Sequence, residues 1–458
     1  MSDTITAIVT PTGEGGVSVI RLSGAMSLTT ASLLFRPARG ADLKEFTPQR
    51  VYFGEILDPK SQTLVDEVLL TYFKAPKSFT AEDVVEISAH GGLFVTTKIL
   101  ELLQDQGARL AEPGEFTRRA FLNGRIDLSQ AEAVTDVIHA QSDRALRSAM
   151  AQLKGSLSTQ LNEWFERLLA VLAQLEASID FSEEGLEFQK RETTLKEIQA
   201  IQKDLEALIQ TYRQGKIFRE GAQVVLLGKP NVGKSSLLNA LLNEDRAIVT
   251  PMPGTTRDTL EERMRINDIH INIIDAAGLR QNPESIEKEG IKRAKAALDR
   301  ADLALVIFDG SKALDPNDDL LIREVVDKPH RVLLNKCDLP LQLDAHALKE
   351  KFPDAEFIRI SAKHGTGLNE LCENIYHFVV GDSSLNETLV ITRERHRQCL
   401  DTANNALLKS CASLEKELSE EFVAVDVQVA MDRLSVILGK TFEDDLLDQI
   451  FGEFCIGK

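Results

Sequence analysis

The octapeptide Gly228-Lys-Pro-Asn-Val-Gly-Lys-Ser235 constrains the fold of this chain more than any other feature. It matches G-x-x-x-x-G-K-[ST] and lies between an apolar run at 224–227 and a helical stretch at 236–242. In such a context the glycines let backbone N–H groups close around a phosphate. Lys234 reaches the β- and γ-phosphate oxygens, and the Ser235 hydroxyl binds Mg²⁺. The motif alone could be a glycine-rich turn with a surface lysine, but its setting predicts a phosphate loop between a strand and a helix.

Three further motifs follow in order, each at the end of an apolar run. Asp275-Ala-Ala-Gly278 fits D-x-x-G, in which the Asp holds Mg²⁺ through water and the Gly N–H contacts the γ-phosphate. Asn335-Lys-Cys-Asp338 places a carboxylate that can accept from both N1–H and N2–H₂ of guanine, a pair of donors that adenine lacks. Ser361-Ala-Lys363 fits the short loop that backs the base. The four motifs together predict a guanine-nucleotide site.

The position after D-x-x-G bears on hydrolysis. Ras-type proteins place a water-orienting glutamine there, whereas this chain has Leu279, whose isobutyl group cannot orient water. Hydrolysis therefore needs another polar group or is slow. Glu284, Glu287 and Glu289 follow and could reach back, but spacing does not choose among them. An exposed helix start, which favours acidic residues, explains all three equally well.

The segment Gly254-Thr-Thr-Arg-Asp258 lies between the first two motifs and has proline and glycine on its flanks. It is typical of a loop that the γ-phosphate orders and hydrolysis releases. Thr256 is then the expected second protein ligand of Mg²⁺.

The hydrophobic pattern divides the chain into regions that differ in the secondary structure they predict. Residues 1–118 mix short strand-like runs with one helical stretch near 96–104, which predicts an α+β domain. Helical periodicity fills 119–220 and returns after 382, in stretches expected at 388–420 and 427–450. Between them, apolar runs alternate with helical segments, which predicts a mostly parallel sheet with helices on its faces. The runs are 224–227, 271–274, 303–308, 331–334 and 356–360. The simplest arrangement is a helical domain split in sequence by an inserted α/β domain.

Length and charge limit the number of domains and the kinds of partner that this chain can bind. The 458 residues suggest roughly three domains. With 53 Lys and Arg against 71 Asp and Glu, the net charge is −18, so the overall field disfavours DNA and anionic membranes. Contact with RNA then needs a local basic patch, although solvated helix faces would explain the candidate residues equally well. The candidates are Arg118, Arg119, Arg144, Arg147 and the run 393–397.

Targeting features are also informative. No apolar run approaches a membrane span, and the N-terminus lacks a basic segment followed by an apolar one. The five cysteines form no C-x-x-C pair, which argues against a disulfide framework or a zinc knuckle. We therefore expect a cytoplasmic protein.

Over its whole length the chain resembles the tRNA-modifying GTPase family MnmE, also called TrmE. The resemblance rests on the domain order and on three sequence segments. They are Glu112-Pro-Gly-Glu-Phe-Thr-Arg-Arg-Ala-Phe-Leu-Asn-Gly124, Gly254-Thr-Thr-Arg-Asp258 and Cys455-Ile-Gly-Lys458. It implies a folate-binding and dimerisation domain at 1–118, a helical domain from 119–220 and 382–458, and an inserted Ras-like G domain at 221–381.

The family's activity is the second implication. The resemblance implies a homodimer that forms a heterotetramer with the flavoprotein MnmG, whose cofactors are FAD and NADH. Together they would add an aminomethyl or carboxymethylaminomethyl group to C5 of the wobble uridine of certain tRNAs. GTP would be hydrolysed to GDP, and 5-formyltetrahydrofolate or a related tetrahydrofolate would supply the carbon. A different class remains open, namely a regulatory GTPase of RNA or ribosome assembly with no modification chemistry of its own.

The resemblance also assigns roles to particular residues. It makes Glu287 the general base, with Lys234 as a second catalytic residue. It also implies a K⁺ ion held by the side chain of Asn231 with Thr250, Met252 and Thr255. On its own, Asn231 would be interpreted as a turn residue that satisfies its own backbone. The implied folate contacts are Arg21, Glu86, Arg125 and Lys458.

Two positions depart from the family pattern, and a third, Cys455, has two interpretations. Arg125 stands where the family often has lysine, which preserves the charge but changes the donor geometry. Ala276 replaces the common threonine between two working positions, so we expect little effect. Cys455 is either a thiol that assists the uridine chemistry or a small residue packed with Phe454 and Ile456.

Motifs and resemblance together define the expected GTP-binding residues. They are Asn231, Val232, Gly233, Lys234, Ser235, Ser236, Thr250, Pro251, Met252, Pro253, Gly254, Thr255, Thr256, Asp275, Ala276, Ala277, Gly278, Asn335, Lys336, Asp338, Ser361, Ala362 and Lys363.

Overall fold

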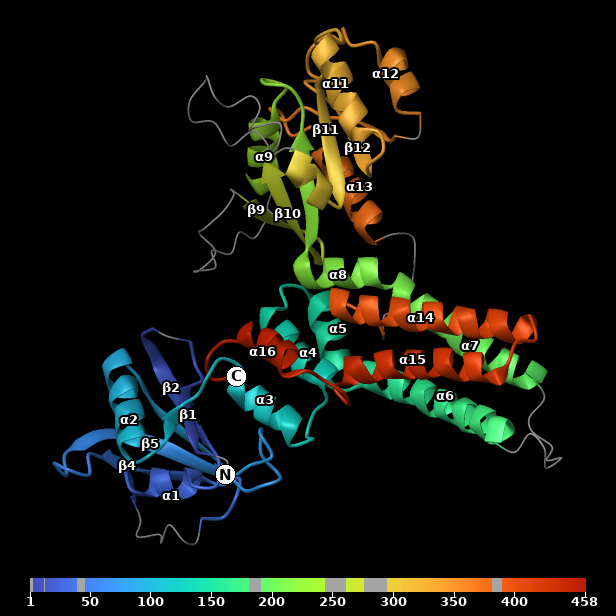
Figure 1. Ribbon diagram of the computed structural model, residues 1–458. Coiled ribbons are helices and arrows are strands. Elements are labelled where there is room, and N and C mark those ends of the chain that lie inside the picture. Colours follow the sequence, from blue (N-terminus) through green and yellow to red (C-terminus); the bar gives the residue numbers. More distant parts are fainter. Residues whose placement is uncertain are drawn as a thin grey trace. The chain divides into compact units, whose positions relative to one another are not determined.

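The computed structural model describes residues 3–11, 13–38, 46–180, 191–243, 261–275, 295–353, 355–380 and 389–458. The chain divides into two compact units (Figure 1). The first comprises Met1–Ile138, Gln152–Gln199 and Asn405–Lys458, and the second comprises His139–Ala151 and Ala200–Asn404. Each unit is therefore assembled from stretches that are distant in the sequence.

The first unit contains a seven-stranded sheet with the order β3-β4-β5-β6-β2-β1-β7. Its neighbouring strands are antiparallel except for β1 and β7, which are parallel. The strands are β1 (Ile5–Ile8), β2 (Gly15–Ser23), β3 (Phe35–Pro37), β4 (Val51–Leu57), β5 (Leu64–Phe73), β6 (Val84–Gly91) and β7 (Arg109–Leu110). Helices α1 (Ser27–Ser32) and α2 (Leu93–Asp105) connect strands of this sheet. The α+β class predicted for this region is confirmed.

Buried and exposed residues alternate along the strands of this sheet, so its two faces differ. In β5, Val68 and Leu70 are buried, whereas Leu69 between them is exposed. Successive side chains of a strand point to opposite faces, so one face is a core and the other is open. Helix α2 covers the core face, where Ile99 and Leu103 are fully buried in the same cluster.

The helices of the first unit come from two separate stretches of sequence. The long helix α6 (Ser156–Asp180) packs along α15 (Glu420–Leu438), which confirms that the helical domain is split in sequence. Smaller helices are α3 (Glu115–Leu122), α4 (Leu128–His139) and α16 (Asp444–Gly452). The division between the two units falls within α5 (Asp143–Leu153), α7 (Arg191–Gln210) and α14 (Glu394–Glu415).

The boundaries expected for the last helices were wrong. In place of one helix over 427–450, α15 ends and α16 begins after a break at Gly439. Gly439 has a φ of 73°, and a Cβ there would lie 2.7 Å from the ring of Phe121 and 2.8 Å from Leu128 Cβ. Only glycine combines this left-handed conformation with so close an approach, so the helix ends there.

The second unit contains a six-stranded sheet with the order β13-β12-β11-β8-β10-β9. All neighbours are parallel except β9 and β10, which form an antiparallel hairpin. The strands are β8 (Ala222–Leu227), β9 (Glu261–Ile266), β10 (Ile269–Asp275), β11 (Leu303–Asp309), β12 (His330–Asn335) and β13 (Phe357–Arg359). The mostly parallel sheet is confirmed, and β9, which has no long apolar run, is an addition to the prediction.

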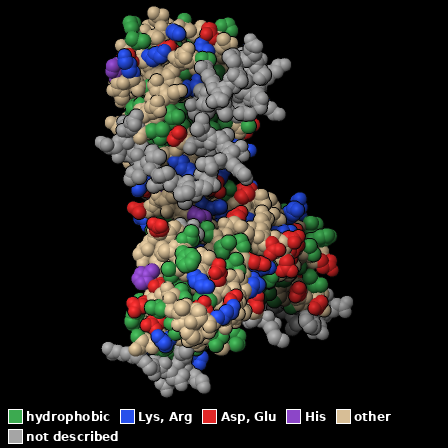
Figure 2. Space-filling view, turned by 90° about the vertical axis from the view of Figure 1, so that its left-hand side faces the viewer, with side chains coloured by type: hydrophobic (Ala, Val, Ile, Leu, Met, Phe, Trp, Pro, Cys, Tyr) green, Lys and Arg blue, Asp and Glu red, His purple; other side chains and the backbone are tan. Residues whose placement is uncertain are grey.

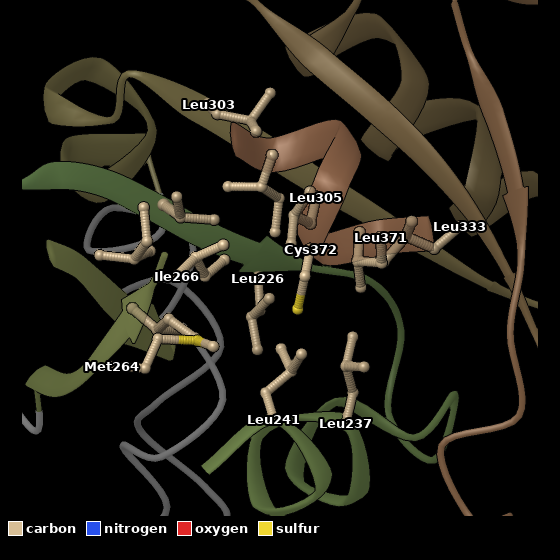
Figure 3. Close-up of a cluster of buried hydrophobic side chains, with 14 of the residues drawn as sticks. Leu226, Leu237, Leu241, Met264, Ile266, Leu303, Leu305, Leu333, Leu371 and Cys372 are labelled. Carbon is tan, nitrogen blue, oxygen red and sulfur yellow. The ribbon is translucent and has the colours of Figure 1, made fainter. Parts of the chain in front are cut away.

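Both faces of this sheet are covered, as its apolar runs require. Val224 and Leu226 of β8 belong to one cluster with residues of α9 (Lys234–Asn243) and α13 (Leu368–Val380). Figure 3 shows Leu226 of this cluster with Leu237 of α9 and Leu371 of α13. Val225 and Leu227 point into the opposite cluster. There they meet side chains of α11 (Pro316–Val325) and α12 (Ala345–Lys351). Helix α8 (Tyr212–Glu220) precedes β8. Within the described ranges, no helix has the length and apolar character that a membrane span requires.

Candidate functional site

The turn after β8 is shaped by two glycines that contact the sheet backbone and a neighbouring side chain. Gly228 has a φ of 155°, and a Cβ there would lie 2.6 Å from the carbonyl oxygen of Ile307 in β11. Gly233 has a φ of 102°, and its Cβ would collide with the side chain of Asn335. Both positions therefore exclude side chains, and the loop lies directly on the carboxyl ends of the strands.

The carbonyl oxygens of this loop are occupied by donors from the chain itself. The Lys234 ammonium donates to the carbonyls of Gly228 at 2.6 Å and Lys229 at 2.8 Å. Lys336 donates to the Asn231 carbonyl at 3.1 Å, and Asn335 donates to the Val232 carbonyl at 2.7 Å. In a trans peptide the N–H points away from its C=O, so the N–H groups that follow these carbonyls are turned away from the donors. Clustered N–H groups at the start of a helix form an anion site.

The loops after β12 and β13 meet beside this turn. The Asn335 side chain also accepts from the Ala362 N–H at 3.0 Å, so one amide joins the phosphate loop to the segment 361–363. The Asp338 carboxylate accepts from the Ser361 hydroxyl at 2.6 Å. This hydrogen bond lowers the pKa of Asp338 below its usual value, which keeps the carboxylate ionised as an acceptor. The Lys336 ammonium is held by Asp309 at 2.7 Å.

The structure thus brings together twelve of the residues expected to bind GTP. They are Asn231, Val232, Gly233, Lys234, Ser235, Ser236, Asn335, Lys336, Asp338, Ser361, Ala362 and Lys363. Ser235 and Ser236 are exposed in the first turn of α9. Lys229 and Asp309, which no motif had singled out, also belong to this cluster.

Other expected residues cannot be placed in this geometry. The backbone of Asp275 ends β10, where it is the registered partner of Leu226 in β8. The side chain of Asp275 lies outside the described residues, as do Thr250, Pro251, Met252, Pro253, Gly254, Thr255, Thr256, Ala276, Ala277, Gly278 and Glu287.

A second candidate site lies on the open face of the N-terminal sheet. The register aligns Thr71, Glu86 and Arg21 across β5, β6 and β2. Arg21 binds Glu86 through two nitrogens, at 2.8 and 2.9 Å. A cavity of about 510 Å³ opens beside them. Its lining is Gln49, Phe73, Pro76, Lys77, Ser78, Phe79, Val84, Glu86 and Arg125.

Two guanidinium groups contact one aromatic ring at this cavity. Arg21 lies 5.0 Å and Arg125 lies 5.2 Å from the centre of the Phe79 ring. Arg125 also donates to the Phe79 carbonyl. Burial, together with the nearby charge of Arg21, lowers the pKa of Arg125. Two like charges this close favour an anionic group between them. Phe79 was missed from the sequence, because it lies in a polar loop with no periodic pattern.

The segment 455–458 is bound to the same unit. Ile456 forms an antiparallel bridge with Pro113, and the Phe116 N–H donates to the Lys458 main-chain oxygen at 3.1 Å. Phe116 in turn lies 5.6 Å from the Arg21 guanidinium, so Phe116 connects Lys458 with the cavity residues. Cys455 is exposed.

The basic residues considered for RNA are largely paired with carboxylates. Arg119 binds Asp3 at 2.6 Å and Glu115 at 2.9 Å, and Arg118 binds Asp448 at 2.9 Å. The others behave similarly: Arg144 pairs with Asp268, and Arg397 pairs with Glu394 and Asp401. Arg147 donates to the Asp143 carbonyl, and Arg393 is buried. In Figure 2, acidic and basic side chains are interspersed over the described part of the face that it shows. Arg118, Arg119, Arg144 and Arg397 are therefore each compensated locally by a carboxylate of this chain.

Comparison with known proteins covers the whole chain. Residues 128–455 match the family model of the MnmE helical domain, and residues 4–125 match that of the GTP-binding protein TrmE N-terminus. Proteins named tRNA modification GTPase MnmE are 43% identical in Alkaliphilus metalliredigens and 44% identical in Moorella thermoacetica, each covering 100% of both chains. The protein of that name from Thermoanaerobacter pseudethanolicus is 44% identical and covers 100% of this chain and 99% of its own. With identities of this size over the full length and both family models matched, the chain belongs to the MnmE (TrmE) family.

Proposed function

We propose that this chain is a GTPase that hydrolyses GTP to GDP in the service of tRNA modification. The observation that supports the proposal is the set of hydrogen bonds between the phosphate loop (228–235) and the two loops expected to contact the base, 335–338 and 361–363. Asn335 joins Val232 to Ala362, and Asp338 stands beside Ser361 as an ionised acceptor. A site that holds phosphate on one side and offers a lone carboxylate on the other selects guanine nucleotides.

Different residues are proposed to bind the phosphates, the base and the Mg²⁺ ion of GTP. Lys234 and the N–H groups of the loop bind the β- and γ-phosphates and stabilise the charge that develops on them. Asp338 accepts from guanine N1–H and N2–H₂, while Ala362 and Lys363 back the ring. Ser235 and Thr256 would hold Mg²⁺, which neutralises phosphate charge. The exposed hydroxyl of Ser235 in the first turn of α9 suits this role.

Water activation is assigned to Glu287, which the family resemblance makes the general base. Leu279 has no polar atom with which to orient water, so a carboxylate from elsewhere in the chain is required. A K⁺ ion held by Asn231 with Thr250, Met252 and Thr255 would add positive charge near the β/γ bridge. Asn231 is exposed and its carbonyl is already bound by Lys336, which leaves its side-chain amide for this role.

The cavity of the N-terminal sheet is proposed as the folate site, with Arg21, Glu86, Arg125 and Lys458 as contacts. The residues fit the chemistry of a folate. Phe73, Phe79 and Pro76 offer apolar walls for a flat ring, and the Arg21–Arg125 pair suits a carboxylate. A tetrahydrofolate bound there would supply a one-carbon unit.

The remaining chemistry is proposed to need partners. A homodimer through the N-terminal domains is supported by exposed apolar residues on the open sheet face, where Val51, Phe53 and Leu69 are about half exposed. A heterotetramer with the flavoprotein MnmG would bring FAD and NADH. Together the subunits would add the aminomethyl or carboxymethylaminomethyl group to C5 of the wobble uridine of tRNA.

Two measurements test the function. Calorimetry should show GTP bound far more tightly than ATP, because only guanine fills the hydrogen bonds of Asp338. Mass spectrometry of tRNA from cells that lack the protein should show wobble uridines without the C5 substituent. Equal affinity for ATP would reject the nucleotide assignment, and unchanged wobble uridines would reject the role in modification.

A regulatory GTPase of RNA or ribosome assembly would have no need of a one-carbon site, so folate binding separates the two functions. We expect 5-formyltetrahydrofolate to bind the protein, and Arg125→Ala to weaken it by about 10-fold. Arg36→Ala, which removes an exposed arginine paired with Glu55 on β4, is the control. Absence of binding at high micromolar ligand would favour the assembly function.

A further inference from the structure

Lys229 is the second residue of the phosphate loop, and its side chain binds the start of a helix that packs against one face of the sheet. Its ammonium lies 2.5 Å from Asp315 Oδ2 and 2.7 Å from Asp318 Oδ2. These two aspartates begin α11, which covers the sheet face opposite α9. We refer to Lys229, Asp315 and Asp318 as the Lys229 clamp.

The acidic half of the clamp is rigid. Asp315 is the N-cap of α11 and accepts from the Asn317 N–H at 2.8 Å, while the Asp318 carboxylate accepts from the Asp315 N–H at 2.9 Å. This reciprocal arrangement is a capping box, which fixes both carboxylates relative to the helix backbone. The side chain of Asp318 is only 5% exposed, so its charge depends on the Lys229 ammonium for compensation.

The other end of Lys229 contacts the phosphate-binding lysine. The Lys229 carbonyl and the Gly228 carbonyl both accept from the Lys234 ammonium. Gly228 packs so closely against Ile307 of β11 that a Cβ there would lie 2.6 Å from the Ile307 carbonyl oxygen. The first turn of the loop is thus fixed at Gly228 by the sheet and at Lys229 by α11, and Lys234 is bound to both carbonyls.

We propose that Lys229 is a positioning residue for GTP hydrolysis. Its clamp to α11 fixes the carbonyls that hold the Lys234 ammonium, and so presets the phosphate site. The proposal rests on the GTPase function above. A glycine-rich loop without this anchor has more conformations available, and a displacement of about 1 Å at a reacting group lowers the rate by as much as ~100-fold.

The experiment compares variants of the full chain in GTP hydrolysis and in GDP binding by calorimetry. Lys229→Met keeps the length of the side chain and removes its charge, and Lys229→Arg keeps the charge. Lys328→Met is the matched control. It breaks a Lys–Asp pair of similar chemistry, Lys328 with Asp299 at 3.0 Å, just before β12 and therefore at the opposite edge of the parallel sheet.

The expected result is a fall of about 10-fold or more in kcat/KM for GTP and a weaker affinity for GDP in Lys229→Met. Lys229→Arg should stay within about 3-fold of the unaltered protein, because arginine can still bind both aspartates. Lys328→Met should leave both quantities unchanged. Asp318→Asn should lower kcat/KM in the same direction as Lys229→Met, because it weakens the clamp from the other side.

Several outcomes would overturn the proposal. If Lys229→Met lowers only the melting temperature and the folded variant keeps its kcat/KM and GDP affinity, the clamp is merely structural. If Lys229→Met does not fold, Lys229→Arg and Asp318→Asn decide, and unaltered hydrolysis in Asp318→Asn contradicts the proposal. If the unaltered protein itself does not hydrolyse GTP, the GTPase function fails rather than the clamp.

Discussion

At the scale of the residue, two residues adopt left-handed backbone conformations where the loops of the candidate nucleotide site meet. Asn231 has a φ of 66° and Lys336 has a φ of 65°. Such conformations cost roughly 1 kcal/mol or more for residues with a Cβ. They persist because the Lys336 ammonium binds both the Asn231 carbonyl and Asp309. Strain of this kind, over-determined by hydrogen bonds, is typical of functional loops.

The proposed base preference depends on one carboxylate, that of Asp338. Because Asp338 is proposed to accept from guanine through both oxygens, Asp338→Asn should lower GTP affinity by at least about 100-fold and shift preference toward xanthine nucleotides. Isothermal calorimetry with GTP and XTP measures both effects. Asp319→Asn, which changes an exposed aspartate of α11 paired with Lys351, is the control. Retained preference for GTP in Asp338→Asn would contradict the assignment.

Glu394 provides a prediction about pH. Its hydrogen bonds to Arg397, with a further one from Tyr212, lower the pKa of Glu394 from 4.5 to about 2, despite partial burial. A carboxylate with a lowered folded-state pKa stabilises the fold above its unfolded pKa and loses this effect as pH falls toward the folded value.

The stabilisation from Glu394 should therefore be complete above about pH 5 and decline toward about pH 2. For a largely exposed pair it amounts to about 0.5 kcal/mol. Urea unfolding should show Glu394→Gln less stable than the unaltered protein at about pH 6, with the difference shrinking by about pH 3. A difference that stays constant with pH would show that ionisation of Glu394 is not involved.

At the scale of the element, the described candidate nucleotide-binding residues lie in the loops that follow β8, β12 and β13. Parallel strands bring their carboxyl ends to one edge of the sheet, so motifs at strand ends converge. The apolar runs therefore allowed the mostly parallel sheet to be predicted, and the motifs placed twelve candidate GTP-binding residues at strand ends, where the structure brings them together. The strand β9 and the break at Gly439 were not predictable, because they depend on a neighbouring strand and on the Phe121 ring.

The turn between β9 and β10 is bound to a helix of the same unit. Arg144 of α5 pairs with Asp268 in this turn and donates to the Tyr376 hydroxyl at 3.1 Å. Its guanidinium also lies 5.7 Å from the centre of the Phe218 ring. This residue thus links α5, α8, α13 and the hairpin.

Arg144→Met should lower the free energy of unfolding of the second unit by about 2 kcal/mol, because a partly buried carboxylate loses its cation. Urea denaturation followed by circular dichroism measures the change. Arg147→Met, one turn further along α5, is the control, since Arg147 donates to the Asp143 carbonyl at 3.3 Å and pairs with no carboxylate among the described residues. Adding Asp268→Asn to Arg144→Met should recover part of the loss, and strict additivity would mean that the pair is not coupled.

At the scale of the whole molecule, the two candidate sites belong to different compact units. The described nucleotide loops lie in the second unit, and the cavity residues lie in the first. Three helices, α5, α7 and α14, run from one unit into the other. The proposed activity needs both sites, so it is a property of the intact chain and its partners rather than of either unit.

The proposed K⁺ site leads to a prediction about monovalent cations. GTP hydrolysis should be several-fold faster in K⁺ than in Na⁺ at the same ionic strength, because a bound cation offsets charge near the β/γ bridge. Asn231→Gly removes the proposed ligand while tolerating the left-handed backbone, so it should abolish the difference. Equal rates in the two salts for the unaltered protein would remove the cation from the mechanism.

Local patterns in the sequence were sufficient to predict the classes of element, their order along the chain and a candidate guanine-nucleotide site. Those properties follow from local periodicity and from motifs whose spacing is set by a strand and the loop after it. Residues that are distant in the sequence meet only through the three-dimensional packing: Arg21 with Phe79 and Phe116, Lys458 with the first turn of α3, and Lys229 with Asp315 and Asp318. These contacts depend on strand register and on the packing of helices far apart along the chain, and no local pattern encodes either.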